Sequence, residues 1–340
     1  MQLTELNAKY TLEAAALCSE AYEKEREACT QLPNENFSER IAGCVGWLIA
    51  NGTGAMALEN GKLIGYLAFF QPFENFFGNC AGVFAPLHGC AVSYSENGRG
   101  KTASMLFAFA SERLVKKGVT SYAAALPAHD GELHRSFALN GFGIRCADAI
   151  RKLDRPLVSK APEGIKCREL EKSEWPKVLR LRALLTRHLA KAPAFYPTGS
   201  DYFSTERFEK RETRIFTAEK EGAIIGFIEV GAEGENFVSA SENMRSICGA
   251  CFDEDARGSG AAPYLLSYII STLSAEGWKY LGVDCETLNP TALHFWGKYF
   301  DNYTYSFHRR VDERAIGYEE YIASAEAGFF RSASALCEKL

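Results

Sequence analysis

Six residues, Arg257-Gly258-Ser259-Gly260-Ala261-Ala262, stand directly before a stretch with helical periodicity. Their small side chains let the backbone approach a ligand closely. Amides in the first turn of a helix lack partners within the helix and carry a partial positive charge, so they can bind a diphosphate. Arg257 can add a fork of donors to a phosphate oxygen. The hexapeptide therefore predicts an anion site, with an ordinary glycine turn and a solvated arginine as the alternative.

A second stretch, GRGKTASML from Gly98 to Leu106, contains the Gly-Lys-Thr of a nucleotide phosphate loop. That loop requires another glycine five residues before Gly100, because the chain must wrap around the phosphates before the helix begins. The residue there is Ser95. This mismatch argues against a nucleotide site.

Carboxylates near the ends of two expected strands are candidates for proton transfer. Asp284 and Glu286 end the strand in VDCETLNP, and Glu229 lies within the apolar run GFIEV. A carboxylate at such a position can act as a general base toward an amine. An exposed or salt-bridged carboxylate is the alternative for each of the three.

The elements that position these residues occur twice. KLIGYLAFF is echoed by AIIGFIEVG, GRGKTASMLFAFA by ARGSGAAPYLLSYI, and DGELHRSFALNGF by NPTALHFWGKYF. The three echoes keep one order and a spacing of about 160 residues, which is typical of a duplicated unit. The segment 154–162, DRPLVSKAP, has two prolines and no periodicity, so we expect a linker there. The predicted domains are 1–153 and 163–313, followed by a helical tail at 314–340.

The second half resembles the GNAT superfamily of acyl-CoA N-acyltransferases, and in particular its bacterial tandem members. The resemblance lies in the order of its parts: a strand, the motif R-x-x-G-x-[GA], an amphipathic helix, a second strand and the motif N-x-x-A-x-x-F. The resemblance covers most of Gly164–Asp312. It implies an α/β (α+β) fold of two tandem domains, each with a mixed, mostly antiparallel sheet flanked by helices. It also implies that Arg257 to Ala262 bind the pyrophosphate of acetyl-CoA and that Asn289 lies near its pantetheine arm. The cofactor-binding candidates further include Cys251, Phe252 and Trp296.

Two departures from the family pattern concern the chemistry. Many members have a tyrosine acid in the helix after the loop, but that position is Trp296 here and Phe137 in the first half. Tyr299, one turn later, is a possible substitute or a packed aromatic side chain. In the first-half loop, Thr102 and Ser104 replace small residues that the diphosphate needs. The first half is therefore expected to be a structural or acceptor-shaping partner.

Composition narrows the functional classes. The chain has 340 residues, a net charge of -5 and a pI near 5.8, which provides no basic field for a nucleic-acid backbone. Eleven scattered cysteines favour free thiols in a reducing compartment, and the Cys248–Cys251 spacing lacks the second pair that a zinc site requires. No apolar run is long enough to span a bilayer. We expect a cytoplasmic protein without a metal.

The sequence thus predicts an N-acyltransferase that transfers an acetyl group from acetyl-CoA to an amine by direct attack in a ternary complex. The acceptor is expected to be a small molecule or a peptide, and neither membrane nor nucleic acid is an expected partner. A non-catalytic sensor or scaffold that binds CoA is the alternative, and the oligomeric state is open.

Overall fold

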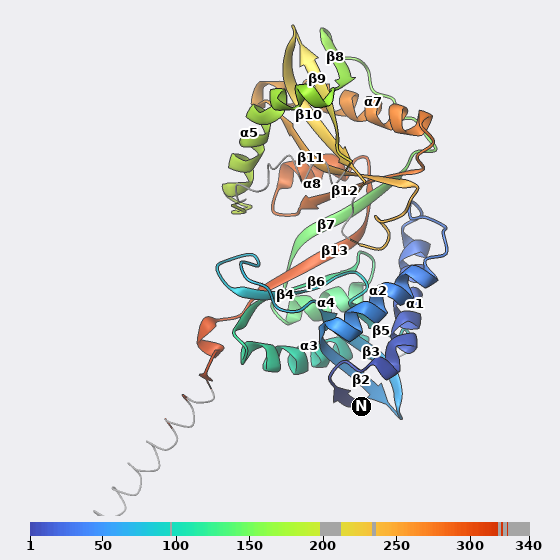
Figure 1. Ribbon diagram of the computed structural model, residues 1–340, viewed down its shortest axis with the longest axis vertical. Helices are drawn as coiled ribbons and strands as arrows, with labels where there is room; N and C mark the ends of the chain where they lie inside the picture. The colour runs from blue at the N-terminus through green and yellow to red at the C-terminus, as the bar shows by residue number, and fades with distance from the viewer. Residues whose placement is uncertain (96, 198–211, 233–235, 319–320, 322–324, 326–340) are drawn as a thin grey trace, which may run out of the picture.

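The computed structural model describes residues 1–95, 97–197, 212–232, 236–318, 321 and 325 (Figure 1). The helical tail expected from residue 314 lies mostly outside the described residues, and at its start Glu313–Ala315 form a 3-10 turn. Residues 154–162 contain no helix or strand. Within the described part of the chain, no helix has both the length and the apolar character needed to cross a membrane.

The two halves repeat one order of strands and helices. The first half consists of β1 Gln2–Thr4, α1 Thr11–Ala28, α2 Ser38–Asn51, β2 Thr53–Glu59, β3 Lys62–Phe69, β4 Ala81–Ala85, β5 Cys90–Val92, α3 Arg99–Val115, β6 Val119–Pro127, α4 Gly131–Leu139 and β7 Gly143–Lys152. The second half consists of β8 Ile165–Glu169, α5 Leu179–Ala190, β9 Arg214–Lys220, β10 Ala223–Gly231, β11 Met244–Phe252, α7 Ala261–Ala275, β12 Tyr280–Glu286, α8 Pro290–Trp296 and β13 Asp301–Arg310. The expected α/β class with two tandem halves is confirmed.

The halves exchange their last strands. A nine-stranded sheet has the order β4-β6-β13-β7-β12-β11-β10-β9-β8, and a four-stranded sheet has the order β1-β2-β3-β5. Strand β13 of the second half pairs with β6 and β7 of the first, and β7 pairs with β12 of the second. Figure 1 shows β7 and β13 side by side between the two halves. The large sheet is therefore continuous through both halves, rather than divided between two separate domains.

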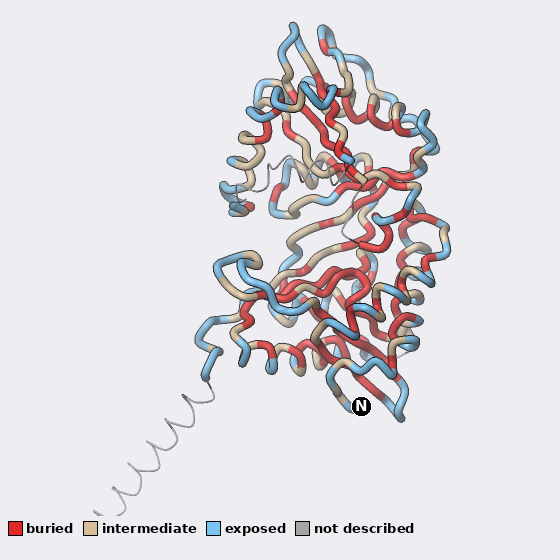
Figure 2. The backbone as a smooth tube through the Cα atoms, in the orientation of Figure 1, coloured by how far each residue is buried: buried red, intermediate tan, exposed pale blue. Residues whose placement is uncertain are grey.

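Alternating side chains of β2 and β3 explain the packing of the first half. Met56 and Tyr66 face α1 and α2, whereas Ala55 and Leu67 face α3. This alternation is expected of a strand buried on both faces. Figure 2 shows that buried residues follow the strands and the inner sides of the helices.

In the second half, α7 covers one face of the sheet with Leu265, Ile269 and Leu273, all fully buried. The other face carries α5, where Leu181 packs with Phe227 of β10. The amphipathic helix expected after the loop begins at Ala261, with Gly260 as its N-cap. Helix α7 ends just before Gly277, whose positive φ of 92° suits a helix terminus.

Candidate active site

The loop before α7 has the geometry of an open helix N-terminus. Gly258 and Gly260 have φ of 78° and 85°, a region that glycine enters without a steric penalty. Arg257 is exposed at the start of this turn. Gly260 packs against Pro162 of the interdomain segment, because a Cβ at position 260 would lie 3.4 Å from the Pro162 ring.

Some of the loop amides already have partners within the protein. Ser259 N–H donates to the Ala256 carbonyl at 3.3 Å, and Ala261 N–H donates to the Ser259 hydroxyl at 3.3 Å. Both distances are beyond the usual range for such bonds. The amides of Gly258, Gly260 and Ala262 have no acceptor among the residues that the structure describes. The turn therefore keeps donors that an anion can use.

The corresponding loop of the first half is closed. Arg99 folds inward onto Asp130, with Nη2 to Oδ2 at 2.6 Å, and both side chains are buried. The Tyr94 ring lies 3.7 Å from the Arg99 guanidinium carbon. The Gly100 amide donates to the Glu132 carboxylate at 2.9 Å. A carboxylate therefore occupies the end of α3, where a phosphate would have to bind.

The helices that follow the two loops are arranged differently. Helix α3 packs closely on α4, whereas α7 and α8 are not closely packed on each other. Ser136 of α4 donates to the Gly100 carbonyl at 2.7 Å and pairs with Ser104 at 2.9 Å.

Strands β11 and β12 separate near this loop. They pair in parallel from Met244 to Ile247 with Tyr280 to Val283, and within the described residues the pairing stops there. Beyond Cys248, the stretch Gly249–Phe252 of β11 therefore has backbone groups on the β12 side without a strand partner among the described residues. Such an edge can bind an extended amide-containing chain through main-chain hydrogen bonds.

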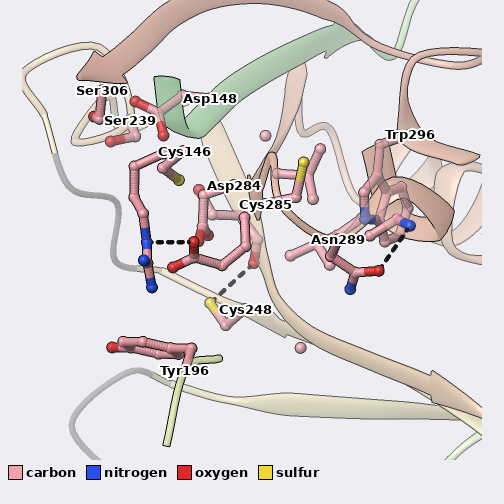
Figure 3. A pocket seen from close by; sticks show the side chains of 18 of the residues that line it. Cys146, Asp148, Tyr196, Ser239, Cys248, Asp284, Cys285, Asn289, Trp296 and Ser306 are labelled. Atoms are coloured by element: carbon pink, nitrogen blue, oxygen red, sulfur yellow. Dashed lines mark hydrogen bonds and ion pairs between the residues drawn. The ribbon is translucent and has the colours of Figure 1, made fainter. Parts of the chain in front are cut away.

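A cavity of about 490 Å³ opens at this separation. Its walls come from both halves (Figure 3). The second half contributes residues of α5, β11, β12, α8 and β13, and the first half contributes β7 and aromatic side chains. The polar lining residues are Arg145, Cys146, Asp148, Asn236, Ser239, Ser246, Cys248, Asp284, Cys285, Glu286, Asn289 and Ser306.

Three β-bulges direct side chains into this cavity. In each, one strand has an extra residue relative to its partner: Cys248 on β11, Arg145 on β7 and Tyr303 on β13. All three line the cavity. Bulges re-aim side chains and are common beside active sites.

The three predicted carboxylates have different surroundings. Asp284 is exposed and lies opposite Asp148 in the β12–β7 register, and both line the cavity. Glu286 also lines it and forms an ion pair with Arg145, with Nε to Oε2 at 2.8 Å. Glu229 is buried away from the cavity lining and pairs with Arg182 of α5 at 2.9 Å. Asp284 and Glu286 thus lie together, and Glu229 belongs to a buried ion pair.

Asn289 caps α8. Its side-chain oxygen accepts from Thr291 Oγ1 at 2.7 Å and from the Ala292 amide at 3.4 Å, and it lies 3.2 Å from His188 Nε2. These contacts orient the side-chain amide, and its Nδ2 has no acceptor among the described residues. Since Asn289 lines the cavity, Nδ2 is available to a ligand carbonyl.

The predicted aromatic residues are distributed between cavity and core. Trp296 is buried and lines the cavity. Tyr299 is half-buried, packs with Phe295 at a ring separation of 5.3 Å, and is not a lining residue. Phe252 lies over Gly226, where a Cβ would come within 2.1 Å of its ring. The close approach of the Phe252 ring therefore explains why position 226 is a glycine.

Two cysteines that the sequence placed near the site, Cys285 and Cys251, are poor nucleophiles. Burial, reinforced by the charges of Asp284, Asp148 and Glu286, raises the pKa of Cys285 to about 12. Burial likewise raises the pKa of Cys251, at the end of β11, to about 11. The thiolate is the reactive form, so both groups are unreactive near neutral pH. Among the described residues, no three His, Cys, Asp or Glu side chains are grouped to hold a metal.

Sequence reasoning missed the contribution of β7. Arg145 and Asp148 interrupt the apolar pattern of this strand, which was the available signal. Their role depends on the strand exchange, because β7 reaches the site only by pairing with β12. The aromatic segment between Pro72 and Gly89 also reaches the cavity, through Phe76, Phe77 and Phe84.

Comparisons with known proteins relate the second half of the chain to a known family. Residues 180–301 match the family model of the acetyltransferase (GNAT) family, so the second half contains a GNAT domain. A comparison with curated proteins found no significant match.

Solved structures extend the likeness over both halves. A GCN5-related N-acetyltransferase from Sphaerobacter thermophilus has a TM-score of 0.58 at 15% identity, over 91% of this chain and 95% of that chain. A GCN5-related glucosamine N-acetyltransferase region of a fungal multi-domain GH3 β-N-acetylglucosaminidase has a TM-score of 0.55 at 15% identity, over 90% of this chain and 38% of that one. At these identities the likeness shows the fold.

Proposed function

We propose that this protein is an N-acetyltransferase that transfers an acetyl group from acetyl-CoA to an amine in a ternary complex. The observation that carries the proposal is the contrast between the two loops. The α7 loop has amides with no described acceptor, whereas the α3 loop is closed by Arg99–Asp130 and by Glu132. One donor site per chain follows, with residues Arg257 to Ala262 binding the pyrophosphate.

The donor is proposed to lie along β11. From the pyrophosphate at α7, the pantetheine arm would follow the edge of Gly249–Phe252 that has no described strand partner, with Asn289 Nδ2 donating to one of its carbonyls. This path ends in the cavity, where the thioester would meet the acceptor. We place the first half in a structural and acceptor-shaping role, and we expect the protein to work in the cytoplasm.

The amine must lose a proton before or during attack, and the leaving thiolate must be stabilised. We propose Asp284, with Asp148 opposite, as the group that accepts the proton. Glu286 is held by Arg145, and Glu229 by the buried Arg182, so both are better suited to positioning than to proton transfer. No acyl-enzyme is required, because Cys285 and Cys251 stay protonated.

The test is turnover. The protein is incubated with acetyl-CoA and a panel of small amines and peptides, and released thiol is titrated over time. Sustained release that depends on the amine, and an acetylated amine found by mass spectrometry, are the expected results. Release of thiol without any acetylated amine would contradict the proposal.

A non-catalytic CoA-binding protein is the second candidate. It is favoured by Trp296, which stands at the position where many family members have a tyrosine acid and whose indole cannot serve as one. Calorimetry distinguishes the two functions. Tight binding of acetyl-CoA with no turnover across the panel would favour the sensor.

A further inference from the structure

Arg145 is the most constrained cation in the cavity wall. Its Nε pairs with Glu286 at 2.8 Å, and its side chain is 14% exposed. Its Nη1 and Nη2 have no hydrogen-bond acceptor among the residues that the structure describes. An arginine that is fixed through Nε presents these two nitrogens as a fork.

The backbone of β7 is shaped to place this side chain. Cys146 pairs with Ser306 and Ile144 pairs with Phe307, so Arg145 is the extra residue of the bulge. Regular alternation would direct Arg145 to the face opposite Cys146 and Asp148. The bulge instead brings Arg145 to the cavity that also contains those two residues.

Two aromatic rings contact the guanidinium group of Arg145. Its central carbon lies 4.7 Å from the centre of the Phe77 ring and 5.3 Å from that of Tyr196. Phe77 has a φ of 52°, which is unfavourable for a residue with a side chain, and its ring also contacts His308 at 4.9 Å. Such outliers persist where the surroundings impose them, often at ligand sites.

The part of the chain that the structure describes contributes no other cationic side chain to the cavity lining. Burial, with the charges of Arg145 and Arg310, lowers the pKa of His308 to about 4, so this imidazole is neutral at neutral pH. The negative groups of the lining are Asp148, Asp284 and Glu286. Among the described lining residues, Arg145 is therefore the cation that an anionic group entering the cavity would meet.

Asp284 and Asp148 mark the other end of the acceptor. Glu286 is two residues beyond Asp284 on β12, so the Arg145–Glu286 pair and the two aspartates are about 7 Å apart along the strand. Asp284 and Asp148 are directly opposite each other on the paired strands β12 and β7, and Asp148 accepts a hydrogen bond from Asn236 Nδ2 at 3.2 Å. An ammonium group at Asp284 and an anion at Arg145 fit this arrangement.

We propose that the acceptor is an amino acid-like molecule, with its amine toward Asp284 and its carboxylate bound by the Nη1–Nη2 fork of Arg145. This inference rests on the proposed function, since it names the acceptor class of the same site. A planar carboxylate matches the fork with two parallel hydrogen bonds. A doubly charged phosphate would be repelled by Glu286, which shares the guanidinium. The rings of Phe76, Phe77 and Tyr196 suit an apolar or aromatic side chain.

Matched pairs of amines test the carboxylate requirement. Wild-type protein is assayed with phenylalanine and 2-phenylethylamine, tyrosine and tyramine, and lysine and 1,5-diaminopentane. In at least one pair the carboxylated member should have a kcat/KM higher by about tenfold to a hundredfold, since hydrogen bonds to a charged group have that worth. Equal or better use of the decarboxylated member in every pair that is turned over would overturn the proposal.

Variants assign the effect to Arg145. Arg145→Met should abolish the preference for the carboxylated member, and Arg145→Lys should restore part of it, because lysine keeps the charge without the fork. Arg151→Met is the matched control: Arg151 lies on the same strand, but it donates to the Tyr299 carbonyl outside the cavity. A preference that survives Arg145→Met, or that Arg151→Met removes equally, contradicts the assignment.

A binding measurement separates this inference from the proposed function. In the presence of CoA, N-acetylphenylalanine and its primary amide are titrated into wild type and Arg145→Met by calorimetry. Tighter binding of the carboxylate to wild type alone supports the site even if no amine is turned over. Equal binding of the two compounds to wild type, including no binding of either, overturns it.

Discussion

Arg99 and Arg257 occupy the same position of the repeat and have different surroundings. Arg99 is buried, stacked on Tyr94 and paired with Asp130, whereas Arg257 is exposed beside amides that lack described acceptors. A buried ion pair is costly to break, because its remaining charge stays desolvated. An exposed arginine contributes little to stability but can bind a phosphate. The residue type alone therefore does not distinguish a binding arginine from a structural one.

Substituting each arginine with glutamine should separate these roles. Arg257→Gln should weaken CoA binding by about tenfold, the worth of one charged hydrogen bond, with little change in melting temperature. Arg99→Gln should reduce the free energy of unfolding by about 3–5 kcal/mol. Calorimetric titration and denaturant unfolding of both variants provide the measurements. A loss of CoA affinity in a folded Arg99→Gln protein larger than that in Arg257→Gln would reverse our assignment of the donor site.

The cysteines allow a second prediction at this scale. Because the pKa of Cys285 is raised to about 12, its thiol is uncharged at pH 7 and is a weak nucleophile. A protein with Cys251→Ala and Cys285→Ala should retain turnover within about threefold of wild type. Steady-state assays and a search for acetyl-enzyme by mass spectrometry are the readouts. Abolished turnover with CoA binding intact would indicate a covalent intermediate.

At the level of elements, the two loop–helix units differ in whether the amides at the helix N-terminus are bonded within the protein. In the first half, Glu132 of α4 supplies a carboxylate to the α3 amides, and α4 packs closely on α3. In the second half, Thr291 stands at the position that corresponds to Glu132, and it instead donates to Asn289. The α7 terminus consequently retains its attraction for an external anion.

Removing the diphosphate from the donor tests this interpretation. Acetyl-pantetheine should be used with a KM at least about tenfold above that of acetyl-CoA, because the contacts with the helix amides and Arg257 are lost. Arg257→Gln should raise the KM for acetyl-CoA but leave that for acetyl-pantetheine unchanged. Comparing both proteins with both donors forms a double-mutant-type cycle, which isolates the interaction between Arg257 and the diphosphate. An equal effect of the variant on both donors would place Arg257 away from the diphosphate.

At the level of the whole molecule, the exchange of β7 and β13 makes the halves interdependent. Strand β13 lies between β6 and β7 in the sheet, and β7 lies between β13 and β12. Removing either strand would leave its two neighbours without a hydrogen-bonding partner on that side. Each gap would expose backbone donors and acceptors that the sheet now pairs. The exchange also builds the cavity, since Arg145 and Asp148 belong to the first half and Asp284 to the second.

Division of the chain between residues 157 and 158 is therefore expected to give two fragments that fold only together. Co-expressed fragments should copurify as one complex with a single cooperative unfolding transition. Each fragment alone should aggregate or lack native circular dichroism, because unpaired strand edges favour aggregation. Two soluble fragments with independent native spectra would show that the exchange is dispensable.

Local sequence patterns were enough to predict several elements of the fold and several residues of the candidate site. The sequence alone predicted the small residues of the loop from Gly258 to Ala262, the helix after them and the repeat in both halves. These features could be predicted because helix termini and strand patterns depend on residues that are close together in the chain. The α/β class and the GNAT domain followed from that order. Asp284, Glu286, Asn289 and Trp296, which the sequence singled out, all line the cavity.

Tertiary structure decided how those pieces combine. The closure of the first loop depends on Glu132, which lies 32 positions from Gly100. Glu229, equally plausible as a base in the sequence, is held by Arg182, and Arg145 enters the cavity only through a bulge on an exchanged strand. Strand partners and registers are set by contacts between distant residues. For this reason the local sequence predicts a donor loop, whereas only the tertiary structure shows that side chains of the first half line the same cavity as Asp284.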